Sequence, residues 1–329
     1  MTTLDVLVPA GGGPGWGPID RLTELTTRYF HGIHHYIEYH TGANRSYALM
    51  SLIPRRHARG RDLLVLAPMP GQLNHAVIPS LRYAYDRVAG WVIDSFQFDQ
   101  IPHAAKQART FDWMYVTDSA DAKMWSQRGV TDVRTLEWGA DCLSAAHMDR
   151  GKDWDVLRVG RQPHAWDDDA IVREHMQLAG IGYHGRPAVG PLSLHAQLSR
   201  SKVIVAFSNL VSPADYTSKT VEYLTGRWTD ALAHGCLCAG VVPDTAPARH
   251  QVPDFARIDL NPLNVEASLS RLHTALDGWT PELAGRIKAH AREHTDWRYR
   301  LLDIAHDLDL PTSHLEDDIA TLRALPLNP

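Results

Sequence analysis

The chain has 329 residues, of which 44% are hydrophobic and 22% are charged, a balance typical of a folded globular protein and not of a disordered or fibrous one. Its formal net charge of −5 provides no general attraction to a polyanion, so general nucleic-acid binding is not expected. The N-terminus lacks the pattern of a leader, and no apolar run approaches the about 18–20 residues of a transmembrane segment. A cytoplasmic protein is therefore expected, and at roughly 150 residues per domain it would have two domains.

Short apolar runs alternate with amphipathic stretches through the first half of the chain. The predicted strands are 4–10, 62–68, 87–94, 113–118 and 133–138, and the clearest helices are 18–30 and 120–129. Near-continuous apolar strands are typical of a parallel sheet that is covered on both faces. The pattern therefore predicts an α/β domain with a mainly parallel sheet.

A second cycle of strands and helices follows. Its predicted strands are 155–161, 202–208, 236–243 and 255–260, followed by helices at 280–294 and 295–310. The polar stretch 144–155 is the best linker between the cycles. The sequence therefore predicts one domain over 1–148, a second over 149–295, and a terminal helix and tail over 296–329.

The first loop, "PAGGGPGWGP" (9–18), tests for a dinucleotide fold. A dinucleotide fingerprint needs Gly-x-Gly-x-x-Gly, but counting from Gly11 or Gly13 the third position is Trp16 or Pro18. The loop is either a plain turn or a segment whose amides, at Gly12 and Gly13, approach a phosphate or a sugar. The spacing disfavours a dinucleotide oxidoreductase.

The segment "YLTGRWTDALAHGCLCAGVVPD" (223–244) combines a short helix with an apolar strand. Thr225 or Gly226 is a suitable helix start, and Gly235 stands where a left-handed cap is wanted before the strand. The small residues Ala231 and Ala233 are explained by close packing against the sheet. Arg227 and Asp230 are not explained by packing.

Charged residues at the start of this helix suggest a ligand. A helix N-terminus such as the one at Gly226 attracts phosphate, and Arg227 adds two donors to the same place. The carboxylates of Asp230 and Glu222 are suited to accept hydrogen bonds from vicinal hydroxyls. A diphosphate linked to two hydroxyl-rich groups is a nucleotide sugar, and the competing interpretation is a salt-bridged surface helix.

The same residues resemble the donor-site motif of the large retaining group of GT-B glycosyltransferases, in particular its spore-maturation type. The family's usual Glu-x7-Glu-Ala-x-Ala-x-Gly reads here as Glu222, seven residues, Asp230 and "ALAHG". "VLRVGRQP" (156–163) is similar to the family's Val-Gly-Arg stretch, in which the arginine, here Arg161, contacts the diphosphate. The Trp-Gly-x-Asp at 138–141 and "HTDWRYRLLDI" (294–304) are similar to the segments that cross between its domains.

The resemblance implies two Rossmann-like domains that face each other across a cleft, with the terminal helix crossing back to the first domain. It implies transfer of a sugar from a nucleotide-diphosphate sugar to a hydroxyl acceptor, with retention and without a metal or other cofactor. Arg161, Gly226 and Arg227 would hold the diphosphate, and Glu222 or Asp230 would bind hydroxyls. The base, the sugar, the acceptor and the oligomeric state stay open.

Asp94 is the candidate catalytic acid or base of the first domain. It stands where a strand ends, the position at which open α/β sheets bind ligands, and it resembles a Trp-x-x-Asp stretch of the spore-maturation relatives. It would orient the acceptor hydroxyl or the transferred sugar. His75 and Asp99 are rivals, and a structural role for Asp94 is the alternative.

Several other residues are weaker candidates. His31 and His35 have helical spacing, but two ligands do not make a metal site, and no metal site is predicted. The acids 167–169 are expected to favour a helix start. Trp16, Trp91, Trp166 and Trp228 are expected near the cleft, as ring-stacking or packing residues. The three cysteines, Cys142, Cys236 and Cys238, are expected to be small core residues.

Two other functions fit the same sequence features. A nucleotide-sugar epimerase on the same architecture would need similar diphosphate and hydroxyl contacts. A non-catalytic carbohydrate- or partner-binding protein on a decayed transferase scaffold would explain why aspartate replaces the second glutamate at Asp230. Product analysis separates the first from a transferase, and ligand binding tests the second.

Overall fold

The computed structural model describes residues 2–9, 16–37, 57, 59–76, 79–148, 151–186 and 191–326. The chain divides into two compact units, of which the first is Met1–Glu137 with Arg298–Asp318 and the second is Trp138–Trp297 with Ile319–Pro329. The expected linker at 144–155 overlaps a helix, α7 (Cys142–His147), and a strand, β7 (Trp154–Arg158). The domain limits given by the sequence stay predictions.

The first unit contains a parallel sheet of six strands in the order β2-β1-β3-β4-β5-β6. Its strands are β1 (Thr3–Pro9), β2 (His34–Ile37), β3 (Arg61–Ala67), β4 (Val88–Val92), β5 (Trp113–Val116) and β6 (Val133–Thr135). Every predicted strand of this half is present. The parallel α/β prediction is therefore confirmed, because the central strands are apolar and buried along their length.

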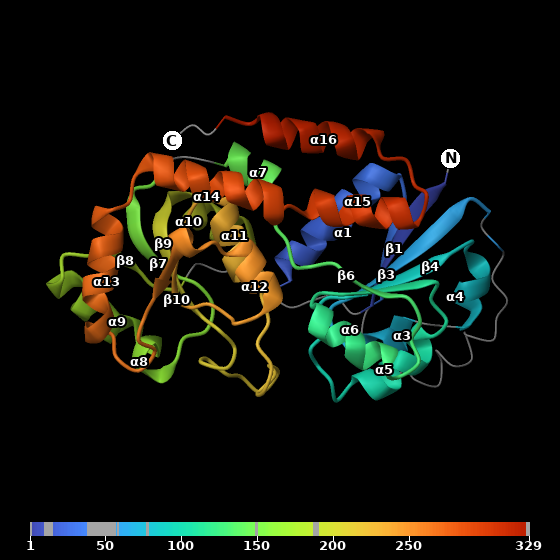
Figure 1. Ribbon diagram of the computed structural model, residues 1–329, viewed down its shortest axis with the longest axis horizontal. Helices are drawn as coiled ribbons and strands as arrows, with labels where there is room; N and C mark the ends of the chain where they lie inside the picture. Colours follow the sequence, from blue (N-terminus) through green and yellow to red (C-terminus); the bar gives the residue numbers. More distant parts are fainter. Residues whose placement is uncertain are drawn as a thin grey trace. The chain divides into compact units, whose positions relative to one another are not determined.

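Helices cover both faces of this sheet (Figure 1). The helical elements of the unit are α1 (Gly17–Phe30), η1 (Pro70–Gln72), α3 (Leu73–Ala76), α4 (Pro79–Ala84), α5 (Ile101–Ala108) and α6 (Ser119–Ser126). The core between the sheet and helices α3, α5 and α6 includes Val65, Ile101 and Trp125. Burial of these apolar side chains is the main force that holds the helices on the sheet.

Strand β2 shows that the helical spacing of His31 and His35 does not place them on one helix. Helix α1 ends at Phe30, His31 takes a left-handed conformation with φ of 53°, and His35 lies in β2, paired with β1. Gly32 makes the turn close to β1, because a Cβ at this position would lie 1.7 Å from the Leu4 carbonyl oxygen. The two histidines therefore do not lie one turn apart.

The C-terminal part of the first unit is held by buried and half-buried polar contacts. Helix α15 (Trp297–Asp307) accepts a hydrogen bond on Asp307 from the Tyr115 hydroxyl at 2.7 Å. Arg298, 1% exposed, donates to the Tyr29 hydroxyl at 2.8 Å. A further helix, α16 (Ser313–Ala324), lies in the tail for which no element was predicted, and its residues are divided between the two units.

Membrane-crossing helices were sought throughout the described ranges. None of these helices combines the length and the apolar character that a bilayer span requires.

The second unit contains a parallel sheet of five strands in the order β11-β10-β9-β7-β8. Besides β7, its strands are β8 (Tyr183–His184), β9 (Ser201–Phe207), β10 (Leu237–Val241) and β11 (Arg257–Asp259). Its helical elements, with α7, are α8 (His164–Asp167), α9 (Asp169–Leu178), α10 (Pro191–Arg200), α11 (Gly226–Ala233), α12 (Ala246–Gln251), η2 (Asp254–Ala256), α13 (Glu266–Asp277) and α14 (Pro281–His294). All three cysteines are buried, as predicted.

Two segments that resemble crossing motifs lie side by side in the second unit. The Ala140 N–H donates to the Thr295 carbonyl at 2.9 Å, and the Trp297 N–H donates to the Ala140 carbonyl at 2.9 Å. The Thr229 hydroxyl on α11 donates to the Gly139 carbonyl at 2.9 Å. The Trp-Gly-x-Asp and Thr-Asp-Trp sequences therefore form one hydrogen-bonded junction beside α11.

Candidate functional site

The carboxyl edge of the second sheet gathers the candidate residues of this unit. Since the strands are parallel, the loops that follow β7, β9 and β10 all begin at the same edge. Arg161 follows β7, and Glu222 lies in the long loop between β9 and α11, whose helix starts at Gly226 (Figure 1). This is the edge at which open parallel sheets bind ligands.

Helix α11 begins and ends as the sequence predicts. Thr225 is extended at the N-cap with φ of −136°, and the helix runs from Gly226 to Ala233. Gly235 follows with φ of 74°, and a Cβ there would lie 2.8 Å from the Ala284 carbonyl of α14. Glycine is needed at 235 for its conformation and for this close approach.

Arg227 lies in the first turn of α11 and reaches back to the sheet. Its Nη1 donates to the carbonyl of Phe207, the last residue of β9, at 3.0 Å. Its guanidinium packs on Gly160, where an added Cβ would lie 2.9 Å from Arg227 Cζ. Gly160 also has a φ of 74°, so a side chain at this position would be strained and would displace the arginine.

Arg161 is the second cation of this edge. Its Nε donates to the Ser212 carbonyl at 3.2 Å, and its Nη1 donates to the Tyr216 hydroxyl at 2.8 Å. Burial lowers the pKa of Arg227 to about 10, and the positive charge of Arg161 contributes to the lowering. Within the described ranges neither arginine has an ion pair with an acid. Two guanidinium groups thus lie close together without a neutralising carboxylate.

Four buried polar atoms near these arginines in the chain have no hydrogen-bond partner in the described part of the molecule. They are Gln162 Oε1, Ser208 Oγ, Asn209 Oδ1 and Thr225 Oγ1. Buried polar atoms in folded proteins are normally hydrogen-bonded, so such a group is notable. They lie on the loops that follow β7 and β9; the first loop carries Arg161, and the second leads into α11, whose first turn carries Arg227.

The two acids of the motif have different surroundings. Glu222 is partly exposed, and its Oε2 accepts from the Asp244 N–H at 2.7 Å, in the loop after β10. Asp230 is 4% exposed, and burial raises its pKa to about 6, with His195 and Asp141 as charged neighbours. Glu222 therefore belongs to the loops of the edge, whereas Asp230 lies in the packed interior beside α10.

Two histidines, His195 on α10 and His234 at the end of α11, contact each other. His195 Nδ1 lies 2.9 Å from His234 Nε2, and His234 is 2% exposed. Burial lowers the pKa of His234 well below its ordinary value, and the charges of His195, Lys152 and Lys288 act in the same direction. This region therefore favours a neutral imidazole at His234.

The carboxyl edge of the first sheet carries Asp94, just after β4. Its backbone N–H donates to the Pro68 carbonyl at 2.8 Å, and its side chain is partly exposed. Ser95 donates to Asp121 at 2.5 Å, and burial raises the pKa of Asp121 to about 6. Of the rivals, Asp99 is exposed, and the side chain of His75 lies outside the described residues.

Other sequence candidates have structural roles or lie outside the described ranges. The loop with Gly12 and Gly13 is not among the described residues. Asp168 caps helix α9 through the Ala170 and Ile171 amides, as expected for a helix start. Three tryptophans that were expected near the cleft are at most 1% exposed, so they pack in the core and do not offer a ring face: Trp91, Trp166 and Trp228.

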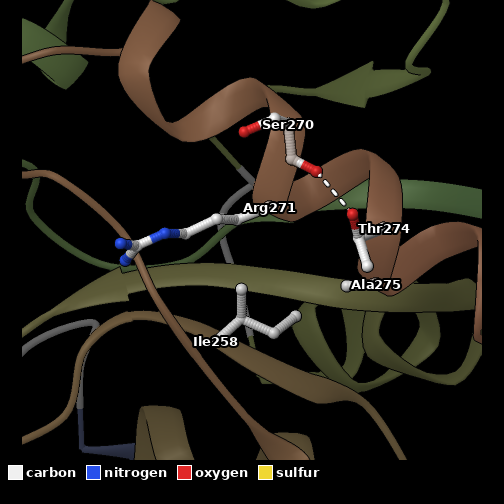
Figure 2. Close-up of a pocket in the computed structure, with 5 residues that line it drawn as sticks. All are labelled: Ile258, Ser270, Arg271, Thr274 and Ala275. Carbon is white, nitrogen blue, oxygen red and sulfur yellow. Dashed lines mark hydrogen bonds between the residues drawn. The ribbon is translucent and has the colours of Figure 1, made fainter.

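Metal-binding clusters and surface depressions were also considered. In the ranges that the structure describes, no group of three or more His, Cys, Asp or Glu residues is arranged to hold a metal ion. Figure 2 shows a depression of about 340 Å³ between β11 and α13, lined by Ile258, Ser270, Arg271, Thr274 and Ala275. These elements carry none of the candidate residues.

Comparisons with known proteins give a fold. No protein-family model matches the sequence, and neither does any curated protein. The chain resembles HepE of Anabaena, solved in complex with UDP-glucose, with a TM-score of 0.55 and 11% identity over 93% of this chain and 99% of that one. It also resembles an alpha-glucosyltransferase, solved with UDP-glucose and DNA containing an abasic site, with a TM-score of 0.54 and 10% identity over 94% and 99%. The chain has the GT-B fold.

Sequence reasoning missed several residues at the carboxyl edges of this GT-B fold. Gly160 stood in the quoted Val-Gly-Arg stretch, and a glycine directly before a candidate arginine was a usable signal. Ser212 and Tyr216, which contact Arg161, gave no signal, because their loop is about fifty residues further along the chain. Asn209 was hidden in an ordinary polar stretch.

Proposed function

We propose that the protein is a glycosyltransferase that moves a sugar from a nucleotide-diphosphate sugar to a hydroxyl acceptor. The observation that carries the proposal is the pair Arg161 and Arg227, two cations at the carboxyl edge of the second sheet that have no acid partner among the described residues. The GT-B fold supports it, because two similar structures were solved with UDP-glucose. UDP-sugars are therefore the first donors to test.

Charge stabilisation of the leaving group is the central step of this proposal. The bond between the anomeric carbon and the phosphate oxygen breaks, and the acceptor oxygen forms the new bond as its hydroxyl loses a proton. Negative charge then grows on the diphosphate, where Arg161, Arg227 and the first amides of α11, at Gly226, would stabilise it. Because these donors are fixed before the reaction, the proposed transfer needs no metal. Retention of configuration is proposed from the family resemblance.

Each unit contributes acidic residues with a proposed role. Glu222, partly exposed at the edge, is the better placed of the two motif acids to accept from ribose or sugar hydroxyls. Asp230 stays a predicted hydroxyl ligand, although its 4% exposure favours Glu222. Asp94, at the carboxyl edge of the first sheet, is proposed to orient the acceptor hydroxyl or the transferred sugar.

Thermal shift with a panel of nucleoside diphosphates and their sugars tests the donor site. At least one compound is expected to raise the melting temperature of the parent protein, and the rise should be lost in Arg161→Ala. The exposed Arg200, which pairs with Asp153, provides the control Arg200→Ala. If no compound stabilises the parent protein, the donor-site proposal is wrong.

Product analysis then tests the reaction. The best donor is incubated with hydroxyl acceptors, with and without EDTA, and the products are separated by mass and by anomeric configuration. Transfer that persists in EDTA supports the metal-independent proposal. An isomerised donor without transfer identifies an epimerase, and binding without any turnover identifies a binding protein.

A further inference from the structure

The connection between β9 and α11 is unusually long for an α/β unit. It runs from Ser208 to Thr225, whereas such connections usually have about 2–6 residues. Loops of this length without secondary structure in a compact domain are commonly functional. It also carries Glu222, so it already forms part of the candidate site.

Asn209 closes the base of this loop. Its Nδ2 donates to the Ser218 carbonyl at 2.9 Å and to the Val221 carbonyl at 2.8 Å, and the residue is 4% exposed. The Thr217 hydroxyl and Ala214 form a tight turn inside the loop, with the Ala214 N–H donating to Thr217 Oγ1 at 3.0 Å. The loop is therefore ordered by its own polar groups.

Arg161 holds the tip of the loop at two points. It donates to the Ser212 carbonyl and to the Tyr216 hydroxyl, and its guanidinium carbon lies 5.0 Å from the centre of the Tyr216 ring. Since the phenol oxygen accepts from Arg161, its O–H is left to donate to another acceptor. Across the described residues no such acceptor is found for Tyr216.

Tyr216 is an exposed aromatic residue, and burial in the core does not account for its position beside Arg161. Its surface is 68% exposed, although an arginine of the candidate site is fixed against it. It also acts electrostatically on Arg227, so it lies near both cations. An anion bound by Arg161 and Arg227 would present oxygen acceptors beside the Tyr216 O–H.

We propose that Tyr216 is a donor-binding residue, whose hydroxyl donates to the diphosphate. The proposal rests on the proposed function, because it takes the ligand to be a nucleotide-diphosphate sugar. It assigns specificity for the diphosphate to a residue outside the motif. The affinity for a nucleoside without phosphate should therefore not depend on Tyr216.

Calorimetric titration of the best nucleoside diphosphate from the panel measures the effect. We expect Tyr216→Phe to weaken binding by about tenfold, since a hydrogen bond to a charged group is lost, and Tyr216→Ala to weaken it further. The free nucleoside should bind all proteins alike. Tyr83, 76% exposed in the first unit, provides the matched control Tyr83→Phe, which should bind like the parent protein.

A second readout follows the loop itself. Lys219 is exposed within it and is a trypsin site. The diphosphate is expected to slow cleavage after Lys219 in the parent protein, and this protection should be weaker in Tyr216→Phe. A change in melting temperature alone would not produce this ligand-dependent difference.

The outcomes separate the two proposals. If the parent protein binds a nucleoside diphosphate and Arg161→Ala loses it, while both Tyr216 variants bind like the parent protein, the role of Tyr216 is wrong and the donor site stands. If the Tyr216 variants change only the KM of the acceptor, Tyr216 is not a donor-binding residue. If nothing binds the parent protein, the proposed function itself fails.

Discussion

At the carboxyl edge of the first sheet a hydroxyl pairs with a carboxyl group, whereas at the same edge of the second sheet two arginines lie together and, among the described residues, have no ion pair with an acid. Ser95 donates to Asp121 in the first unit, and no cation takes part in that contact. In the second unit every hydrogen bond described for the side chains of Arg161 and Arg227 goes to a neutral oxygen. The second edge is therefore suited to bind an anion, whereas the described contact at the first edge provides no positive charge.

Removing the Arg227 side chain should have the largest effect on anion binding at the second edge. Arg227→Ala is expected to weaken nucleoside-diphosphate binding by more than about a hundredfold, because several charge-assisted hydrogen bonds are lost. Titration calorimetry measures it, with Arg200→Ala as the control. Since Arg227 also holds the Phe207 carbonyl, the melting temperature of each variant is measured beside it. If the affinity of Arg227→Ala for the nucleoside diphosphate is unchanged, the second edge is not the diphosphate site.

Asp94 tests the first edge. Asp94→Asn is expected to bind the diphosphate within about twofold of the parent protein and to transfer sugar about a hundredfold more slowly, because the carboxylate would act on the acceptor side. Steady-state rates at saturating donor measure the loss. Asp99→Asn, an exposed acid of the same segment, is the control. Equal losses in the two variants would contradict a specific role for Asp94.

A methyl group at Gly160 tests whether the position of Arg227 matters for binding at the second edge, because it should displace the arginine. Gly160→Ala is expected to weaken diphosphate binding by about tenfold, because the new Cβ would lie 2.9 Å from Arg227 Cζ. Gly180 has a similar φ of 72° and nothing within 4 Å, so Gly180→Ala carries the same backbone strain without the contact. The two variants should be similarly destabilised. If they also bind alike, the contact with Arg227 has no role in binding.

The pH dependence of stability tests a feature that the two units share, which is a buried aspartate with a raised pKa. Burial raises the pKa of both Asp121 and Asp230 to about 6 from the unfolded value of 3.8. Between these values the folded state binds more protons than the unfolded state, so the free energy of unfolding falls as pH rises, by roughly 1 kcal/mol per pH unit for each group. Asp230→Asn should flatten this fall in urea titrations between about pH 4 and 6. An identical slope in the variant would show that the Asp230 carboxyl is not buried as described.

Sequence by itself determined the parallel α/β architecture and the limits of α11. Long apolar runs must be covered on both faces, and the pair of Thr225 and Gly235 marks a helix start and end through local backbone preferences alone. These are short-range effects, so residue order suffices to predict them. The resemblance also drew attention to Arg161 and Arg227 before their geometry was known.

Tertiary structure decided which of the candidate groups meet. Arg161 and Tyr216 come from loops that are distant in the chain, and only the parallel pairing of β7 with β9 brings these loops to one edge. It also decided burial, since Asp230 and Trp228 lie one turn or less from Arg227 and yet are enclosed while Arg227 reaches the edge. The packing of whole elements decides which side chains of a helix are buried, because burial depends on the neighbouring elements that cover each face.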